Sequence, residues 1–413
     1  MAKATTEQAK GQWKSLPSRE QVEQGIREEL RTRMHASMLE VVYAIFEEEK
    51  ERLCGQPWVR KAPGQGRRGG TERGTIYLEG HRVPVTYPRV VDDEGSRALG
   101  TYQALRSYDL LDPEVQTKLM RGVSTRDYRD VVTKIAEGAG LGRDTVSRAF
   151  IRASQRSLAE INGRDLSQHQ FVAVYIDGIG FGKDTTLVIA MGVTREGQKV
   201  LLGLQEGHTE NAAVVGILLD NLVDRKLALA ERFLAVLDGA KALRAAVLAR
   251  WKGRVLIQRC QVHKKRNVCE HLTPHYGREL VRRVNVAYGM RSYEEARKVM
   301  DNTLLWLDQI SEPAAASLKE GLEETLTVVK LGLPDLLRKT FSSTNPIESI
   351  LDGVRYRTHR VKRWKTGQGK MAARWASSAL LVVEKRLHKV KGASLLSSLV
   401  LALGKVDVAE KVG

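Results

Sequence analysis

Two aspartates in matching local settings are the residues of this 413-residue chain with the clearest capacity for chemistry. Asp177 directly follows the apolar run 174–176, Asp238 directly follows the apolar run 235–237, and a glycine follows each aspartate. A carboxylate that interrupts a buried strand is costly unless something compensates its charge. Each Asp-Gly taken alone is more typical of a turn. The matched pair instead predicts that the two carboxylates share a bound cation.

Glu348 is the best candidate for the third carboxylate that a pair of Mg²⁺ ions with oxygen ligands requires. One of residues 343–345 can cap a helix, and Pro346 fits its first turn, which places Glu348 beside the positive end of that helix. A capping-box role, three residues after Asn345, is the alternative. The acid-free basic stretch that follows favours the metal-ligand interpretation.

Three such carboxylates predict in-line chemistry at a phosphodiester. With two metal ions roughly 3.5–4 Å apart, one ion activates water or a 3′-hydroxyl and the other stabilises the departing oxygen. Mg²⁺ is the expected metal, and Mn²⁺ can substitute for it. The same site can hydrolyse a strand and then join the freed 3′ end to another strand. Lys183 and Arg259 are candidate phosphate clamps, although each could equally be a solvated surface charge.

The elements around the two aspartates alternate in a specific order. Apolar, β-branched runs separated by glycine and charged turns predict three strands, and then a helix, a strand, a helix and a strand follow. Their expected ranges are Phe171–Phe181, Thr185–Thr194, Lys199–Gly207, Asn211–Ala230, Phe233–Leu237, Lys241–Trp251 and Val255–Gln258. This order is that of a ribonuclease H-like core with a mixed sheet. If the first and fourth strands are parallel neighbours, their ends bring the two aspartates together.

The chain beyond this α/β region reads as helical. We expect helices throughout Lys264–Lys339, among them Leu318–Val329, and again within Asn345–Leu387. The second stretch has no acidic residue between Asp352 and Glu384. Its predicted DNA contacts are Arg355, Arg357, Arg360, Lys362, Arg363 and Lys365. Two tryptophans of the same stretch, Trp364 and Trp375, could stack on an unpaired base or belong to the core.

The N-terminal part opens with an amphipathic helical stretch, Glu20–Glu51, for which dimerisation and packing on its own domain are equally plausible. A basic, glycine-rich loop over Pro57–Arg73 follows. It leads into a small hairpin of Thr75–Leu78 and Arg82–Tyr87. This arm could lie along phosphates or be merely an exposed flexible loop.

Residues 99–160 read as helices, and Thr125–Phe150 has the layout of a helix-turn-helix. One helix is expected over Arg126–Glu137, a turn over residues 138–141, and a second helix from Arg143. Arginine and hydroxyl side chains near the start of such a helix reach base edges and phosphates in the major groove. The predicted contacts are Arg143, Thr145, Ser147 and Arg148.

The composition excludes several classes of protein. Lys and Arg outnumber Asp and Glu by 67 to 49, a net charge of +18, which favours a polyanionic partner such as double-stranded DNA. No window approaches the ~18 apolar residues of a membrane span. The polar N-terminal stretch lacks a secretory apolar segment, so we expect a cytoplasmic, nucleoid-associated protein. Three dispersed cysteines do not form a disulfide framework.

Four motifs carry a resemblance to a known family: Tyr175–Gly178, Leu237–Leu243, Gln258–Asn267 and Ser343–Ser349. The chain resembles the Mutator-type bacterial insertion-sequence transposases, which carry an Asp-Asp-Glu triad on a ribonuclease H-like fold. The resemblance implies Asp177, Asp238 and Glu348 as that triad. It covers most of the chain, with an α-helical insertion before the Glu, and Ser124–Tyr128 looks like the family's entry to its helix-turn-helix.

The resemblance also assigns Cys260 and His263, which match the family's Cys-x-x-His. They are expected to lie beside the carboxylates, where they orient them or touch DNA. A zinc site shared with the nearby Cys269, His271 and His275 is the less favoured alternative. The chain departs from the family in two places: Leu237 stands where Ser or Thr is expected, and Arg225-Lys226-Leu227 stands where Arg-Gly-Leu is usual.

We therefore expect an α/β protein in five parts. These are an N-terminal helical and dimerisation region with a basic hairpin (1–98), a helix-turn-helix domain (99–165), the first part of the ribonuclease H-like core (166–265), an α-helical insertion (266–340), and the core's C-terminal helices (341–413). By resemblance, it acts as a homodimeric DNA transposase on terminal inverted repeats and target DNA. A non-catalytic DNA-binding regulator and a ribonuclease H-like nuclease without strand transfer are the alternatives.

Overall fold

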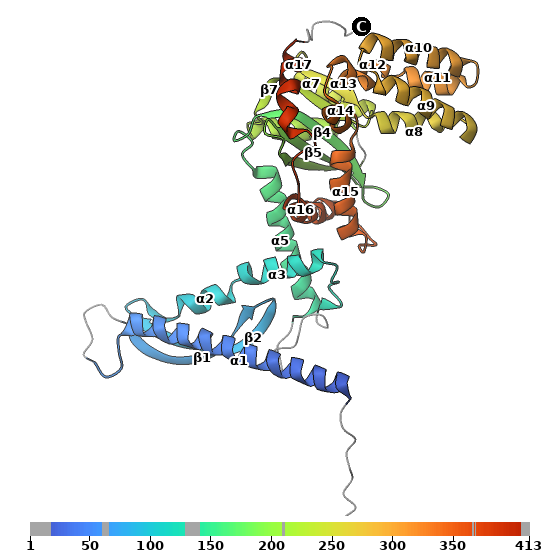
Figure 1. Cartoon of the computed structure of the whole chain (residues 1–413). Coiled ribbons are helices and arrows are strands. Elements are labelled where there is room, and N and C mark those ends of the chain that lie inside the picture. Colours follow the sequence, from blue (N-terminus) through green and yellow to red (C-terminus); the bar gives the residue numbers. More distant parts are fainter. Residues whose placement is uncertain are drawn as a thin grey trace, which may run out of the picture. The chain divides into compact units, whose positions relative to one another are not determined.

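The computed structural model describes residues 18–59, 66–128, 141–208, 211–365, 367 and 369–405. The chain forms two compact units, Met1–Val115 with Val123–Ala149, and Gln116–Gly122 with Phe150–Gly413. Figure 1 shows their elements in chain order. The five-part division that the sequence predicts stays a prediction.

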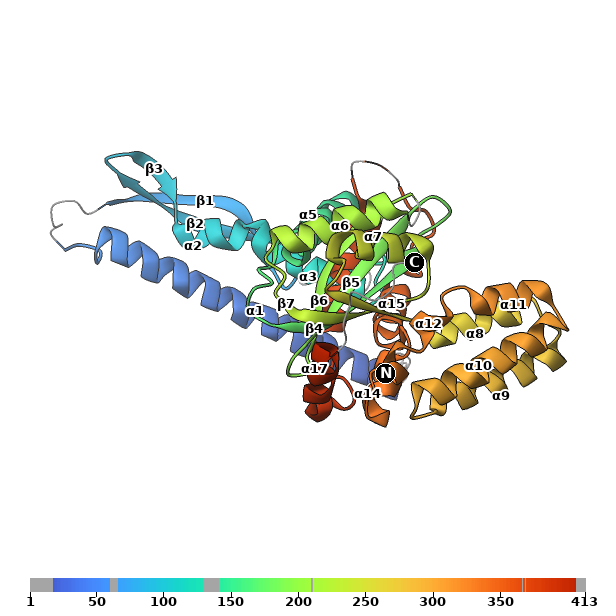
Figure 2. The same cartoon turned by 90° about the horizontal axis from the view of Figure 1, so that it is seen from above.

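In the first unit, a long helix packs on a small antiparallel sheet. The helix is α1 (Arg19–Cys54), and the strands are β1 (Arg67–Leu78), β2 (His81–Asp92) and β3 (Gly95–Ala98), followed by α2 (Gly100–Arg106). Only the C-terminal half of α1 enters the core of this unit, where Val42 and Phe46 meet Ile76 and Val85. Figure 2 shows α1 running beside the sheet. The predicted helix is confirmed.

The hairpin is longer than its sequence pattern predicts. Residues from Arg67 onward, placed by sequence in the basic loop, belong to β1 and pair with β2 out to Val91. Alternate residues of β2 are buried, so pairing extends as far as β2 offers one apolar face. A register shift between Arg68 and Thr71 accommodates Gly69 and Gly70. The predicted loop therefore ends before Arg67, and residues 60–65 lie outside the described residues.

Two helices connect this unit to the rest of the chain: α3 (Tyr108–Met120) and α5 (Arg143–Gly163). The boundary between the two units falls within both of them. The second helix of the predicted helix-turn-helix is confirmed as α5. Most of its predicted first helix and turn, residues 129–140, lies outside the described residues, so the motif as a whole stays a prediction.

A five-stranded mixed sheet forms the core of the second unit. Its strands are β4 (Phe171–Gly180), β5 (Thr186–Thr194), β6 (Lys199–Gly207), β7 (Leu229–Leu237) and β8 (Val255–Arg259). The spatial order is β6-β5-β4-β7-β8. Strands β4, β5 and β6 run antiparallel, whereas β4, β7 and β8 run parallel. The predicted mixed α/β architecture, including the order of its elements, is confirmed.

Helices α6 (Ala212–Asp224) and α7 (Lys241–Trp251) pack on this sheet and share its apolar core. The central strands are almost wholly buried, which explains their continuous apolar runs. The prediction that the first helix continues to Ala230 is wrong. It ends at Asp224 because Arg225 turns back to donate hydrogen bonds to the carbonyl oxygens of Ile161 and Leu202, and β7 then starts at Leu229.

A helical insertion with its own core follows β8. Its helices are α8 (Gln261–Cys269), α9 (Pro274–Gly289), α10 (Tyr293–Asp308), α11 (Glu312–Lys319), α12 (Leu322–Thr325), α13 (Thr327–Lys330) and α14 (Asp335–Phe341). The expected continuous helix over Leu318–Val329 is wrong. The chain breaks at Gly321, whose left-handed φ of 63° leaves no room for a side chain beneath the Arg259 guanidinium.

The chain returns to the sheet through α15 (Asn345–Thr358), which packs against β4, and α16 (Met371–Glu384), which packs against β6. A short 3-10 turn (Ala393–Leu395) and α17 (Leu396–Lys405) follow. The basic stretch is thus two helices with a connection between them. None of the described helices combines the length and apolarity needed to cross a membrane.

Candidate active site

The parallel pairing of β4 and β7 places the two aspartates side by side. In this register Ile176 lies opposite Leu237, so Asp177, within β4, and Asp238, directly after β7, both follow the last residue pair of the two strands. Local hydrogen bonds hold both carboxylates. The amide of Gly178 donates to Asp177 Oδ1, and the amide of Ala240 donates to Asp238 Oδ1, each at 2.8 Å.

Glu348 reaches the same place from another element. It lies in the first turn of α15, the helix that packs against β4. Burial, together with the negative charges of Asp238 and Glu348, raises the pKa of Asp177 to about 6, although the amide of Gly178 and the charge of His263 lower it. All three carboxylates therefore lie within electrostatic range of one another.

This cluster fits a divalent cation. Asp177 is only 7% exposed, and the charge of His263 only partly compensates the negative charge of three neighbouring carboxylates. An all-oxygen donor set at a strand edge and a helix N-terminus suits Mg²⁺ or Mn²⁺ better than a thiol-preferring metal. The carboxylates that would hold the ions are Asp177, Asp238 and Glu348.

A second group of side chains adjoins Glu348. Donor atoms of Cys260, His263 and Glu348 all lie within 4.8 Å of one another, and in the described part of the chain no other three such residues cluster this closely. The imidazole Nδ1 of His263 is 3.7 Å from Glu348 Oε1. A hydrogen bond with Cys260, with the charges of Glu348 and Asp238, raises the pKa of His263 to about 9 despite burial.

Among the described residues, Cys269, His271 and His275 do not cluster with Cys260 and His263. Cys269 Sγ contacts the carbonyl oxygen of Gly277 instead of joining Cys260, and the ring of His275 packs on Tyr276. The closest Cys and His pair thus associates with Glu348, as the Cys-x-x-His expectation placed it.

Arg259, one of the two candidate phosphate clamps, already pairs within the protein. Arg259 is 6% exposed, and its guanidinium donates to the carbonyl and the carboxylate of Glu320. It fastens the end of α11 to the end of β8 and is not free for phosphate. Lys183 is exposed in the loop after β4 and stays a prediction.

The predicted DNA contacts differ in exposure and in whether their side chains already bond within the protein. On α5, Arg143 and Arg148 are exposed, whereas Thr145 and Ser147 are half-buried. In the basic stretch, Arg355 pairs with Asp352, Arg357 with the Gly353 carbonyl and Arg360 with the Gly122 carbonyl. The three remaining residues, Lys362, Arg363 and Lys365, are exposed.

The two tryptophans pack on protein rings. Trp364 lies 4.8 Å from Phe181, and Trp375 lies 4.4 Å from Phe150, measured between ring centroids. Both are half-buried, which favours the core alternative over base stacking.

Sequence reasoning missed Thr344 as a member of the site. It considered Thr344 only as a possible helix cap, but the hydroxyl donates to Glu348 Oε1 at 2.5 Å. Its place four residues before a candidate ligand on one helix face is the signal that could have found it.

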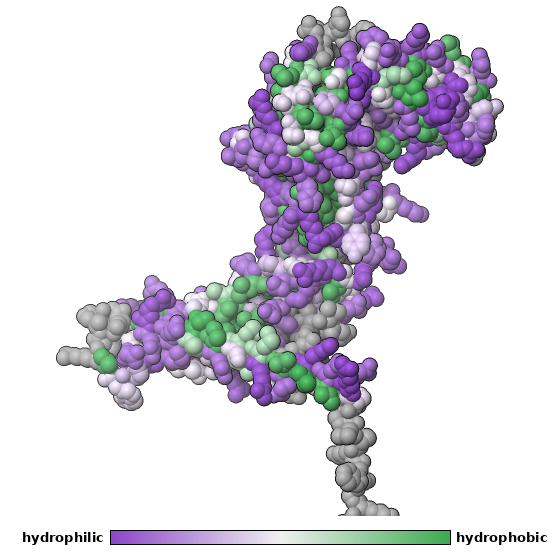
Figure 3. All heavy atoms as spheres, viewed as in Figure 1, coloured by the Kyte–Doolittle hydropathy of each residue, from purple (hydrophilic) through white to green (hydrophobic). Residues whose placement is uncertain are grey.

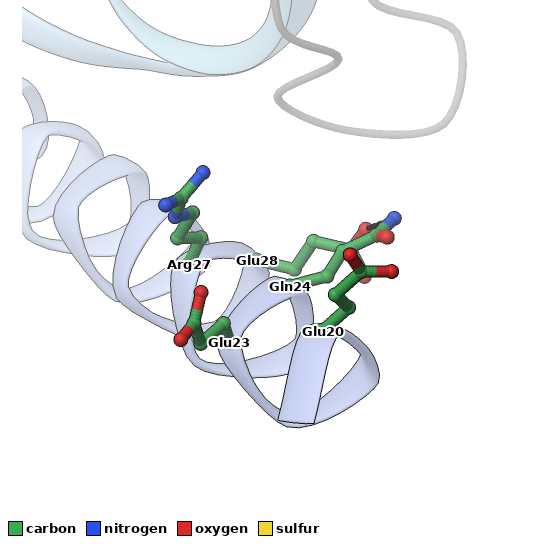
Figure 4. A pocket seen from close by; sticks show the side chains of 5 residues that line it. All are labelled: Glu20, Glu23, Gln24, Arg27 and Glu28. Atoms are coloured by element: carbon green, nitrogen blue, oxygen red, sulfur yellow. Dashed lines mark hydrogen bonds between the residues drawn. The ribbon is translucent and has the colours of Figure 1, made fainter. Parts of the chain in front are cut away.

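A shallow hollow on α1 is a separate feature. Figure 4 shows its lining side chains projecting from that single helix. They are Glu20, Glu23, Gln24, Arg27 and Glu28. All five are exposed, so the hollow has none of the burial that distinguishes Asp177.

Comparison with known proteins identifies the family. Residues 6–368 match the family described as "Transposase, Mutator family". The chain is 26% identical over 298 residues to the transposase for insertion sequence element IS905 of Lactococcus lactis subsp. lactis (strain IL1403), covering 70% of this chain and 71% of that protein. It is 25% identical over 354 residues to the transposase for insertion sequence element ISRM5 of Rhizobium meliloti (strain 1021), covering 82% and 83%. Because the family match spans most of its length, this chain belongs to the Mutator family of transposases.

Proposed function

We propose that this transposase binds the terminal inverted repeats of an insertion sequence and catalyses Mg²⁺-dependent strand cleavage and strand transfer. Asp177, Asp238 and Glu348 are the catalytic metal ligands of this proposal. The observation that supports it is that Asp238, directly after β7, and Glu348, on α15, both act electrostatically on the buried Asp177 of β4. The strand order β6-β5-β4-β7-β8 and its directions support a ribonuclease H-like core.

The protein's own contribution to the reaction is positioning and charge. Asp177 and Asp238 directly follow the last residue pair of β4 with β7, and α15 presents Glu348 from its first turn. Bound metal ions would activate the attacking hydroxyl and neutralise charge on the leaving oxygen. Burial of Asp177 strengthens every electrostatic interaction at the site because water is largely excluded there.

DNA binding is assigned to two exposed basic surfaces. The first is the start of α5, with Arg143 and Arg148, and the second is the connection after α15, with Lys362, Arg363 and Lys365. The net charge of +18 supports a polyanionic partner. We assign transposon ends to the first surface, since a helix with exposed arginines at its start suits the major groove.

The active unit in this proposal is a homodimer that pairs through the N-terminal half of α1. Val22, Ile26, Leu30 and Met34 recur every four residues there and are 45–65% exposed. Figure 3 shows hydrophobic residues along this helix. Residues 19–34 carry four arginines and four glutamates, so this segment has no net charge although the whole chain is basic. Its exposed apolar residues therefore suit a second copy of the chain better than DNA.

The test uses DNA ends taken from the flanks of the coding region. Asp177→Asn, Asp238→Asn and Glu348→Gln should each reduce Mg²⁺-dependent cleavage to background while gel-shift binding stays near that of the wild type. Glu384→Gln is the matched control, because this carboxylate pairs with Arg164 away from the site. Efficient cleavage by any of the three variants would refute the assignment.

The two alternatives separate in the same experiment. A non-catalytic regulator binds the ends but produces no metal-dependent nick with the wild-type protein. A nuclease without strand transfer cleaves, but it fails to join a pre-cut 3′ end to target DNA. Joining by the wild type and none by the triad variants is the outcome that the proposal requires.

A further inference from the structure

Thr344 is a buried helix cap whose hydroxyl has other partners. It is fully buried and occupies the N-cap position of α15, yet its hydroxyl makes no hydrogen bond to a first-turn amide. The N-cap side chains of Asn211, Ser292 and Ser311 each accept such a bond in their own helices, whereas that of Thr273 does not. A buried cap that gives up this bond forgoes about 1 kcal/mol of helix stability, so its hydroxyl serves other partners.

Those partners are the side chains around Glu348. Thr344 Oγ1 lies 2.5 Å from Glu348 Oε1, 3.3 Å from His263 Nδ1 and 3.3 Å from Cys260 Sγ. A hydroxyl has one proton, and the charged, nearest acceptor takes it. Thr344 therefore donates to Glu348, and its lone pair is left to accept from the Nδ1–H of His263.

Cys260, which directly follows β8, contacts the starts of both α8 and α15. Its sulfur accepts from the backbone amide of His263 at 3.5 Å and from that of Thr344 at 3.4 Å. The N-termini of α8 and α15 thus meet at a single buried sulfur just after β8. This contact holds the start of α15 against the C-terminal end of β8, at the edge of the same sheet that contains Asp177.

The sulfur, nitrogen and oxygen atoms of this group share one partner. Cys260 Sγ, His263 Nδ1 and Glu348 Oε1 all lie 2.5–3.3 Å from Thr344 Oγ1. The hydroxyl therefore links the three side chains to one another.

We propose that Thr344 is a positioning residue that holds the Glu348 carboxylate in its metal-binding orientation, and that Cys260 and His263 act on the site through it. This inference rests on the proposed role of Glu348 as a metal ligand. Partners that orient a metal ligand commonly change metal affinity by about 10- to 100-fold when they are removed.

The test compares the loss of the hydroxyl with its conservation in the full-length protein. Thr344→Val keeps the shape of the buried side chain and removes the hydroxyl, whereas Thr344→Ser keeps the hydroxyl. Thr358→Val is the matched control, because Thr358 is buried on the same helix and its hydroxyl bonds only backbone carbonyls of that helix. Mn²⁺ binding without DNA is measured from the electron paramagnetic resonance of free Mn²⁺. The Mg²⁺ concentration for half-maximal cleavage is measured in parallel.

We expect Thr344→Val to weaken Mn²⁺ binding and to raise the half-maximal Mg²⁺ concentration by about tenfold or more. Thr344→Ser and Thr358→Val should stay close to the wild type. Unchanged Mn²⁺ binding by a folded Thr344→Val protein overturns this inference alone. Absence of Mn²⁺ binding by the wild type overturns the proposed metal site itself. If Thr344→Val does not fold, as judged by circular dichroism, Thr344→Ala provides the same loss of the hydroxyl.

Discussion

Replacing Asp177 by Asn should stabilise the metal-free protein while it abolishes cleavage. The folded protein raises the pKa of this carboxyl from its ordinary 3.8 to about 6, because the side chain is buried beside Asp238 and Glu348. The folded state therefore binds a proton more tightly than the unfolded state, and stability falls as the pH rises from about 4 to about 6. Above that window the ionised carboxylate destabilises the fold in full.

The size of the effect follows from the pKa difference of about two units. At about 1.4 kcal/mol per unit, ionisation of Asp177 costs the fold about 3 kcal/mol at pH 8 and about half as much at pH 5. Asn is isosteric and uncharged, and its side-chain oxygen can keep the hydrogen bond from Gly178. A gain of about 3 kcal/mol corresponds to a rise of roughly 6–12 °C in the melting temperature of a domain of this size.

Differential scanning calorimetry with EDTA, at pH 8 and at pH 5, measures this effect. Asp177→Asn should melt above the wild type at both values, and the difference should be larger at pH 8. Mg²⁺ should raise the wild-type melting temperature more than that of the variant. Glu384→Gln is the opposing control, since removing a carboxylate paired with Arg164 at 2.7 Å should lower the melting temperature. A folded Asp177→Asn protein that melts at or below the wild type at pH 8 would refute the reasoning.

Three further predictions concern other parts of the chain. Lys226 has a left-handed φ of 60°, a conformation that favours glycine, so Lys226→Gly should raise the free energy of unfolding by about 1 kcal/mol in urea titrations. A loss of stability would contradict the assigned strain. Leu30→Glu with Met34→Glu should convert a dimer to a monomer in analytical ultracentrifugation, while Thr32→Glu on the opposite face of α1 should not. Arg143→Ala and Arg148→Ala should each reduce the slope of log affinity against log salt by about one for transposon-end DNA, and an unchanged slope would remove that arginine from the interface.

The sequence determines most of the elements, because local burial leaves a local pattern. Continuous apolar runs predicted all five strands of the mixed sheet, and β6 and α7 have the predicted bounds. Element ends were less predictable where distant groups set them. The end of α6 depends on Arg225 reaching carbonyls of two other segments, and the break at Gly321 depends on Arg259 lying over it.

For the candidate site too, the sequence predicts some features and long-range contacts decide the others. Asp177 and Asp238 each follow an apolar run and Glu348 lies in the first turn of a predicted helix, so all three candidates can be identified from the sequence alone. Their proximity is decided by the parallel register of β4 with β7 and by the packing of α15, which are long-range contacts without a local signature. The sequence position of Thr344 suggests an ordinary helix cap. Only the tertiary structure shows that its hydroxyl bonds Glu348 and lies beside Cys260 and His263.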